Sequence, residues 1–384
     1  MTVITAADQF NVGDLFVDLG PLLGEKLLLK CEGMNFAGSV KIKAAMSMLD
    51  DAERSGRLAP GGALVESSSG NLGIALSMAA AGRGYAFTCI TDVRCNPVTV
   101  QLMRTFGADV EIVDAPHPEG GYLAARIARV RELCDEHPAW VWLNQYENPA
   151  NWRGHHSSTG PEILGALGHV DVLFVGAGTC GTLMGVTRYV QEHSPGTRVV
   201  GVDSAGSVTF GGPAAPRYVP GLGAGVRPPL LDATRLDDVV IVDEVDTVRA
   251  CRALASRGFL FGGSTGTVVA GAVDWLARHG RPHDVAVAIA PDLGERYLDT
   301  VYDDAWALAR YGDAVLMPGV RPHRTTRAPG ADAVPAPSGG APSARPGATA
   351  PGAAAPGAAA PAEPLAPSPA GAVPVPARAA VPTA

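Results

Sequence analysis

The sequence predicts an α/β fold: two three-layer α/β/α domains with mainly parallel sheets, followed by a disordered C-terminal tail. Short runs of β-branched residues alternate along the chain with stretches of helical periodicity. Such alternation produces parallel sheets covered by helices on both faces. The chain has 384 residues, of which 384 − 57 = 327 precede the tail, and this is enough for two domains. We place them at residues 1–147 and 148–327.

Each predicted strand is a short apolar run bounded by Gly, Pro, Asn or Asp. The strands span residues 63–66, 85–91, 109–113, 141–143, 171–175, 198–203, 239–242 and 284–290, and an exposed strand is expected at 25–32. The helices span residues 40–53, 72–81, 97–106, 120–136, 182–193 and 246–257. Because ligands of such folds bind beyond the carboxyl ends of the strands, function is expected in the loops that follow them.

The tail, residues 328–384, differs in composition from the rest of the chain. It holds 14 of the 32 prolines and no aromatic residue. Such a segment cannot bury enough apolar surface to offset the entropy lost on ordering. We therefore predict that it is disordered.

Composition excludes several kinds of partner. There are 30 Lys and Arg against 38 Asp and Glu, a net charge of −8, and no basic run, which excludes nucleic acid and anionic membrane surfaces. No apolar stretch is long enough to span a bilayer, and the first residues do not resemble a secretion signal. The six cysteines lack the spacing of a zinc site, so we expect no metal, and free thiols in a reducing cytoplasm.

Two strand-to-helix junctions have the composition of anion sites. In Glu66-Ser-Ser-Ser-Gly-Asn-Leu-Gly73, three hydroxyls and two glycines precede a helix, more than an N-cap requires. In Val175-Gly-Ala-Gly-Thr-Cys-Gly-Thr182, a glycine-rich turn joins a buried strand to a helix. This second loop indicates phosphate binding. With Asp203 at the end of the next strand, it also fits a dinucleotide fingerprint, so a nicotinamide oxidoreductase is an alternative.

The third junction contains a lysine in an unusual position. Ser39 is the expected N-cap of the 40–53 helix, which puts Lys41 in the first turn, where the helix dipole disfavours a cation. A neutral amine is what Schiff-base chemistry needs. The chain has only four lysines, and Lys41 is the candidate among them. A surface lysine is the alternative interpretation.

A fourth junction, Phe261-Gly-Gly-Ser-Thr-Gly-Thr267, opens another helix with two hydroxyls. Alone it is an ordinary helix cap. Beside a lysine and a phosphate loop, one of its hydroxyls could bond a heterocyclic nitrogen.

Five motifs together resemble the cysteine synthase family of pyridoxal-phosphate enzymes, which have fold type II, the fold of the tryptophan synthase β subunit. They are Gly38-Ser-Val-Lys41, Ser68-Ser-Gly-Asn71, Gln145-Tyr-Glu-Asn-Pro-Ala-Asn151, Gly178-Thr-Cys-Gly-Thr182 and Gly263-Ser-Thr-Gly266. Their order and spacing are similar to the family's over roughly residues 13–300. Within the family, the chain is most similar to the branch that makes N-(2-amino-2-carboxyethyl)-L-glutamate.

The resemblance implies a role for each motif. Lys41 would form a Schiff base with pyridoxal 5'-phosphate and remove the substrate's α-proton. The cofactor phosphate would bind Gly178, Thr179, Cys180, Gly181 and Thr182, its 3'-oxygen Asn71, and its pyridine nitrogen Ser264. The substrate would bind Ser68, Ser69, Gly70, Gln145 and Tyr146. Arg126 and Arg217 are candidates for binding substrate anions, and solvated surface charges are the alternative.

The implied reaction is a β-replacement through an α-aminoacrylate, in a homodimer. O-phospho-L-serine and L-glutamate would give N-(2-amino-2-carboxyethyl)-L-glutamate, a precursor of 2,3-diaminopropionate for siderophores or peptide antibiotics. Cysteine synthesis from O-acetylserine or O-phosphoserine is the alternative. Phe36 and Cys180 stand where that family usually has Pro and Gly, which disfavours sulfide as acceptor. A non-catalytic cofactor-binding protein is also compatible with the sequence.

Overall fold

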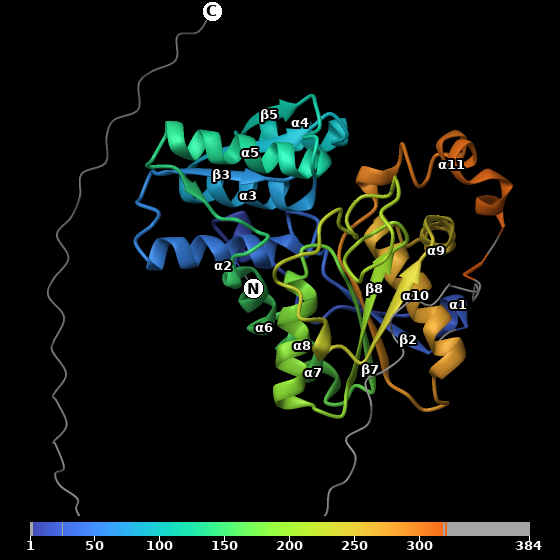
Figure 1. Ribbon diagram of the computed structural model, residues 1–384. Coiled ribbons are helices and arrows are strands. Elements are labelled where there is room, and N and C mark those ends of the chain that lie inside the picture. The colour runs from blue at the N-terminus through green and yellow to red at the C-terminus, as the bar shows by residue number, and fades with distance from the viewer. Residues whose placement is uncertain (1–2, 25, 318, 321–384) are drawn as a thin grey trace, which may run out of the picture. The chain divides into compact units, whose positions relative to one another are not determined.

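The computed structural model describes residues 3–24, 26–317 and 319–320 (Figure 1). Everything below concerns these described residues, which all belong to the unit Met1–Ala333. The predicted disordered tail lies outside the described residues. The predicted domain boundary at residues 147 and 148 stays a prediction.

The larger sheet has six strands in the order β1-β2-β10-β7-β8-β9. Only β1 runs antiparallel, with Phe16 opposite Lys30, and the other neighbours are parallel, with Val175 opposite Gly201. The strands are β1 Phe16–Asp18, β2 Leu27–Cys31, β7 Val172–Gly176, β8 Arg198–Ser204, β9 Asp238–Val242 and β10 Ala286–Ala290. Alternate residues of β7 enter separate cores on the two faces, since Phe174 packs in one and Leu173 in the other.

The smaller sheet has four parallel strands in the order β5-β4-β3-β6. They are β3 Ala63–Ser67, β4 Ala86–Asp92, β5 Asp109–Val113 and β6 Val141–Trp142. Figure 1 shows β3 between α5 on one side and α2 and α3 on the other. Both sheets are thus covered by helices on two faces, which confirms the predicted fold class.

Eleven α-helices occur among the described residues, and all six predicted ones are present within two residues at each end. They are α1 Gly20–Leu23, α2 Lys41–Arg54, α3 Asn71–Arg83, α4 Pro97–Thr105, α5 Gly121–Glu136, α6 Pro149–His156, α7 Thr159–Leu167, α8 Gly181–His193, α9 Glu244–Ala255, α10 Gly263–His279 and α11 Asp304–Tyr311. Short 3-10 helices occur at Ala7–Gln9, Ala233–Arg235, Glu295–Tyr297 and Gly312–Leu316. None of the described helices is long and apolar enough to cross a membrane.

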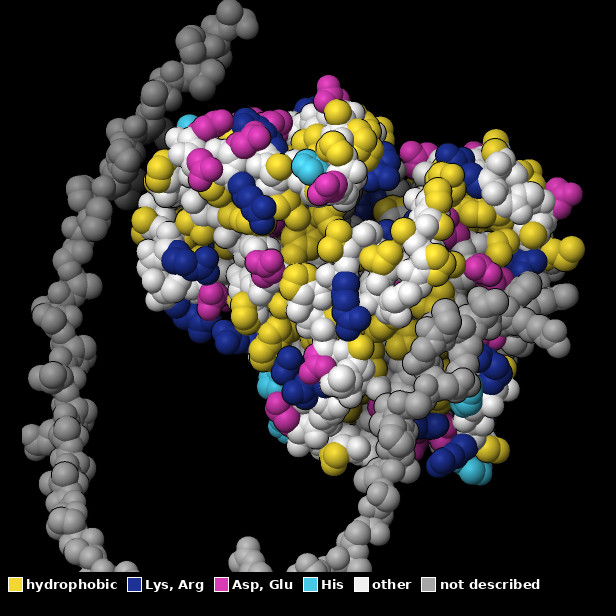
Figure 2. Space-filling view, in the orientation of Figure 1, with side chains coloured by type: hydrophobic (Ala, Val, Ile, Leu, Met, Phe, Trp, Pro, Cys, Tyr) yellow, Lys and Arg dark blue, Asp and Glu magenta, His cyan; other side chains and the backbone are white. Residues whose placement is uncertain are grey.

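The expectation of an exposed strand at 25–32 is wrong. Strand β2 lies inside the sheet, paired with β1 on one edge and β10 on the other, and Lys30 is fully buried. The charge of Lys30 is tolerated because carboxylates of Glu32 and Glu162 lie 2.9 and 3.0 Å from its Nζ. On the molecular surface, Figure 2 shows acidic and basic side chains interspersed rather than gathered by sign.

Candidate active site

Lys41 lies in the first turn of α2, as predicted, but it is the first helical residue and Ser39 is not the N-cap. The N-cap is Val40, because Ser39 forms an antiparallel bridge with Asp292 and Val40 N–H donates to the Pro291 carbonyl at 2.7 Å. The helix therefore begins one residue later than predicted. Burial lowers the pKa of the Lys41 amine, against the opposing influence of Cys180 and Asp292. A neutral amine is thereby favoured.

The other three lysines all have partners. Lys26 Nζ donates to the Pro282 carbonyl at 2.5 Å, and Lys30 and Lys43 pair with glutamates. Lys41 has no ion-pair or hydrogen-bond partner in the described part of the chain. Among the four lysines it is the one whose amine is left available for chemistry.

The loop after β3 carries the three serines, and several of its polar groups form hydrogen bonds within the protein. Ser68 Oγ accepts from the N–H groups of Gly73 at 2.9 Å and Gly70 at 3.3 Å, so it acts as a cap for the start of α3. The thiols of Cys89 and Cys95 donate to the Ser68 and Ser69 carbonyls. Ser69 is exposed. The loop is therefore held by hydrogen bonds around Ser68 and is exposed to solvent at Ser69.

Glu66, fully buried at the end of β3, joins this loop to the Gln145 turn. Its carboxylate accepts from Ser67 N–H, Trp142 Nε1–H and Gln145 N–H at 2.8, 3.0 and 3.1 Å. Burial raises its pKa to about 7, although these hydrogen bonds oppose the rise. The Gln145 amide and the Tyr146 hydroxyl both donate to the Ser67 carbonyl, at 2.8 and 3.3 Å. The predicted substrate residues from two distant segments thus meet at one strand end.

The Asn71 side chain is held from both ends by residues that were not predicted. Its Nδ2 donates to Asp292 Oδ2 at 3.1 Å, and its Oδ1 accepts from Arg296 Nη2 at 2.6 Å. Tyr297 OH donates to the same Asp292 oxygen at 2.5 Å, and burial raises the pKa of both Asp292 and Tyr297. The sequence signal for Asp292 was its place just after a predicted strand, where parallel strands present their carboxyl ends.

The glycine-rich loop after β7 leads into α8 at Gly181. The N–H groups of residues 178–182 find no acceptor within the described residues. Cys180 has a positive φ of 66°, which turns the chain into the helix. Such a run of unpaired amides at a helix N-terminus is an anion-binding nest.

Two residues of α6 that were not predicted support this loop. Asn151 Nδ2 donates to the Gln145 carbonyl at 2.7 Å and to Thr179 Oγ1 at 3.3 Å. An added Cβ on Gly181 would lie only 1.9 Å from Asn151 Oδ1, which is why glycine is needed there. The ring of His155 lies 3.2 Å from Thr182 Oγ1. The available sequence signal was that the polar residues Asn151 and His155 are four positions apart, the spacing of one helix face.

Ser264 lies in the first turn of α10 and is only 2% exposed. The chain passes tightly against it at Gly221, whose φ is +112° and whose Cβ, if present, would be 2.0 Å from Ser264 Oγ. The hydroxyl has no hydrogen-bond partner among the described residues. This hydroxyl could form a hydrogen bond with a heterocyclic nitrogen of a ligand.

The two candidate arginines differ. Arg126 is buried, with its side chain 9% exposed, and its Nε lies 3.3 Å from Asp92 Oδ2, so a solvated surface charge is the wrong interpretation for it. Its Nη1 is buried without a hydrogen-bond partner in the described residues. Arg217 is half-buried and donates to the Gly206 carbonyl at 2.5 Å.

These groups fit pyridoxal phosphate. A dianionic phosphate matches the unpaired amides of residues 178–182, a carbonyl matches the free amine of Lys41, and a ring nitrogen matches the unpartnered hydroxyl of Ser264. The dinucleotide alternative fits poorly, because Asp203, which would have to bind a ribose, is fully buried and its Oδ1 accepts from Ser204 N–H. In the described residues, no group of three or more His, Cys, Asp or Glu could hold a metal.

Comparison with known proteins agrees with this geometry. A family model described as pyridoxal-phosphate dependent enzyme matches residues 17–292. N-(2-amino-2-carboxyethyl)-L-glutamate synthase of Ralstonia nicotianae is 43% identical over 296 residues, which are 76% of this chain and 87% of that protein. Its namesake from Cupriavidus metallidurans is 42% identical over 301 residues, 77% of this chain and 87% of that protein.

Among solved structures, the crystal structure of O-ureido-L-serine synthase is similar, with a TM-score of 0.72 and 32% identity. The match covers 79% of this chain and 99% of that one. The nicotinamide oxidoreductase is excluded. The chain belongs to the pyridoxal-phosphate dependent enzymes, in the cysteine synthase family of β-replacement enzymes.

Proposed function

We propose that the protein joins O-phospho-L-serine and L-glutamate by β-replacement, forming N-(2-amino-2-carboxyethyl)-L-glutamate and phosphate. The product is a precursor of L-2,3-diaminopropionate. The proposal is supported by two synthases of this name that are 42–43% identical and match over 87% of their own length. The observation that carries the cofactor's part in it is a buried Lys41 amine without a partner among the described residues that interacts electrostatically with Cys180, in the loop whose amides at residues 178–182 are unpaired.

We assign cofactor binding to three groups that are unpaired in the described part of the protein and to the side chain of Asn71, which Asp292 and Arg296 already hold. The amides of residues 178–182 would hold the phosphate, Ser264 the ring nitrogen, Asn71 the 3'-oxygen, and Lys41 the aldehyde carbon. Bound pyridoxal phosphate supplies an electron sink that acidifies the α-C–H of an amino acid attached to it. Lys41 Nζ, whose pKa is lowered by burial, can then accept that proton at neutral pH.

Substrate binding is assigned to the loop after β3 and the turn after β6. Ser68, Ser69, Gly70 and Gln145 would hold the α-carboxylate, with the Tyr146 hydroxyl beside them. The buried, unpartnered Nη1 of Arg126 suits an anionic substituent, because a buried guanidinium gains most from a charged acceptor. Arg217 could supply a second cation from the loop before Gly221.

The test is a competition followed by mass spectrometry. Purified protein is incubated with pyridoxal phosphate, O-phosphoserine and equal amounts of L-glutamate and sulfide. We expect the glutamate adduct to dominate, with release of phosphate. Cysteine as the dominant product would move the enzyme to cysteine synthesis, and no turnover with either would favour a non-catalytic role.

Lys41 is tested separately by borohydride reduction and peptide mapping. We expect the modified peptide to contain Lys41, and Lys41→Ala to abolish turnover while keeping the fold. Lys26→Ala is the matched control, because Lys26 is exposed and bonds only a distant carbonyl. Modification at Lys26, Lys30 or Lys43 would refute the assignment.

We further propose a homodimer in a reducing cytoplasm. The compartment is supported by the six cysteines, all of which are free thiols. Light scattering of the purified protein tests the dimer, and a monomeric mass that is active would contradict it.

A further inference from the structure

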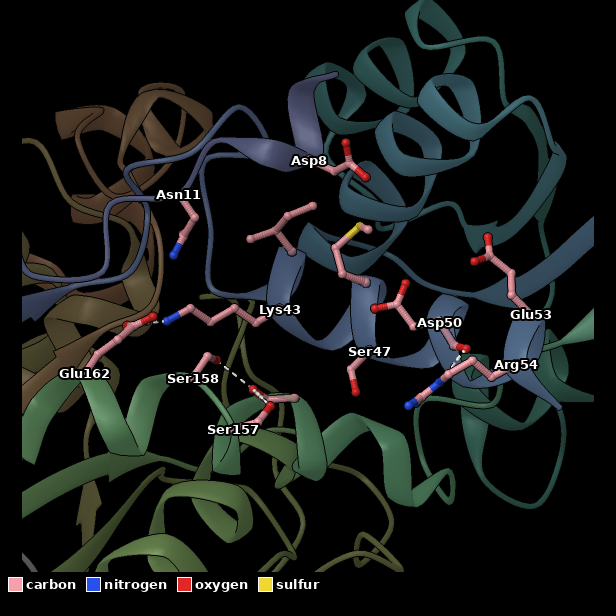
Figure 3. A pocket seen from close by; sticks show the side chains of 13 residues that line it. Asp8, Asn11, Lys43, Ser47, Asp50, Glu53, Arg54, Ser157, Ser158 and Glu162 are labelled. Atoms are coloured by element: carbon pink, nitrogen blue, oxygen red, sulfur yellow. Dashed lines mark hydrogen bonds and ion pairs between the residues drawn. The ribbon is translucent and has the colours of Figure 1, made fainter. Parts of the chain in front are cut away.

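Two lysines and two glutamates form a buried cluster where β2, α2 and α7 meet. Lys43 Nζ lies 2.6 Å from Glu162 Oε2 and 2.8 Å from Glu32 Oε2, and Lys30 Nζ lies 3.0 and 2.9 Å from the same two residues. Figure 3 shows Lys43 extended toward Glu162 at the side of a pocket of about 620 Å³ whose lining does not include Lys41. The cluster is charge-balanced, and the Lys43 ammonium group lies between its two carboxylates.

A chain of hydrogen bonds leads from this cluster to the phosphate nest. Lys43 Nζ lies 3.1 Å from Thr159 Oγ1, which lies 3.2 Å from His155 Nδ1. The other nitrogen of the ring, Nε2, lies 3.2 Å from Thr182 Oγ1, in the first turn of α8. Thr159 is fully buried and His155 is 1% exposed, so water does not offer these groups alternative partners.

The chemistry of the first group sets the direction of every bond that follows. An ammonium ion can only donate, so Thr159 Oγ1 accepts from Lys43. The described residues offer the Thr159 O–H one other partner, His155 Nδ1, and leaving that proton unpaired would cost about 1–3 kcal/mol. Thr159 therefore donates to Nδ1, and Nδ1 is the unprotonated nitrogen.

The tautomer of His155 determines the direction of its hydrogen bond to Thr182. Burial, and then the charges of Lys43 and Lys41, hold the pKa of His155 well below its usual range, so the ring is neutral. With Nδ1 accepting, the ring proton sits on Nε2 and is donated to Thr182 Oγ1. The Thr182 O–H is left over, and no described residue accepts it. It lies at the edge of the unpaired amides of residues 178–182.

We propose that Lys43, Thr159 and His155 form a one-way hydrogen-bond relay that keeps the Thr182 hydroxyl proton directed at the cofactor phosphate. This inference rests on the proposed assignment of the 178–182 loop to that phosphate. The three are positioning residues, since none touches the cofactor. The opposite tautomer would make Thr182 donate to the ring and present a lone pair to the phosphate oxygens, which repels them.

The first experiment reads the tautomer directly by ¹⁵N NMR of full-length holoenzyme labelled at histidine. His155→Gln identifies the signals by their loss. We expect Nδ1 at the shift of an unprotonated nitrogen and Nε2 at that of a protonated one. A wild-type ring protonated at Nδ1 would overturn the relay regardless of any activity.

The second experiment measures pyridoxal phosphate affinity by retitrating full-length protein after the cofactor is removed with hydroxylamine. Thr182→Val and Thr159→Val should each weaken binding about tenfold, the typical effect of losing one hydrogen bond to a charged group. Combining them should add little to Thr182→Val alone, because both act on one bond. Thr187→Val is the matched control: Thr187 lies on α8 like Thr182 and is fully buried like Thr159, but it bonds only the Leu183 carbonyl, and affinity should not change.

The outcomes separate the two proposals. If Thr182→Val leaves affinity unchanged, the loop is not the phosphate site and the proposed function fails there. If Thr182→Val weakens binding but Thr159→Val does not, the relay fails alone. Should Thr159→Val not fold, Thr159→Ser retains the hydroxyl and should restore wild-type affinity and tautomer, and the wild-type spectrum remains decisive.

Discussion

Gly181→Ala is the sharpest test of how the loop at residues 178–182 is built. Gly181 is buried at the start of α8, and an added Cβ would lie 1.9 Å from Oδ1 and 2.5 Å from Cγ of Asn151. Real Cβ atoms do not approach so closely, so the Asn151 side chain must leave its place. That movement breaks its hydrogen bonds to the Gln145 carbonyl and to Thr179 Oγ1.

The expected cost combines two effects. Forcing extra atoms into a packed interior costs about 1–3 kcal/mol. Each broken hydrogen bond adds about 1 kcal/mol, which brings the expected loss of unfolding free energy to about 3–5 kcal/mol. Because the movement of Asn151 also removes the hydrogen-bond partner of Thr179, in the loop assigned to the cofactor phosphate, cofactor affinity should fall as well.

The assay is urea unfolding of cofactor-free protein, followed by cofactor titration. Gly165→Ala is the matched control, since Gly165 is an exposed helical glycine with open space around its Cβ. It should stabilise by about 0.5–1 kcal/mol. The double variant Gly181→Ala/Asn151→Ala should recover part of the loss, because the clash partner is gone.

Two results would refute this reasoning. One is a Gly181→Ala protein as stable as Gly165→Ala, which would mean that Asn151 can move without cost. The other is full additivity of Gly181→Ala and Asn151→Ala, which would mean that the two residues do not oppose each other in the fold.

Three further predictions follow from single contacts. Burial raises the Glu66 pKa from 4.5 to about 7, so this residue's contribution is present below pH 4.5 and lost as pH rises through 7. Urea unfolding should show a loss of about 3 kcal/mol at most across that window, absent in Glu66→Gln, and an unchanged pH dependence in that variant would contradict the assignment. Gly221→Ala should displace Ser264 and weaken cofactor binding about tenfold or more, whereas Gly225→Ala, with open space around its Cβ, should not. Arg126→Gln should destabilise by about 3 kcal/mol, because it removes the buried charge beside Asp92 Oδ2 and leaves that carboxylate only the exposed Arg94 as an ion-pair partner among the described residues, and adding Asp92→Asn should recover part of that in urea unfolding.

Local signals in the sequence were enough to select most of the residues of the candidate site. Lys41, the serine loop and the 178–182 loop each occupy one strand-to-helix junction, whose conformation depends on a few neighbouring residues. Glycines, hydroxyls and periodicity are visible there without knowledge of the fold. The predicted helices and strands are present for the same reason.

The supporting residues could not be predicted in this way. Asn71 is held by Asp292 and Arg296, which are 221 and 225 positions away in the sequence. Nothing local to any of the three residues reveals that they meet. Likewise, the burial of Lys30 depends on Glu162, 132 positions away, so a strand with two lysines looked exposed.

The sequence by itself determined the fold class and the family, and it singled out the candidate lysine and the candidate anion-binding loops, because each depends on short-range patterns. Only the tertiary structure decided that β1 and β2 join the sheet built from the second half of the chain. It also decided that Lys43, Thr159, His155 and Thr182 form one hydrogen-bonded line. Which atom donates in each of these hydrogen bonds depends on which donors and acceptors lie next to each other. Long-range packing alone determines those neighbours.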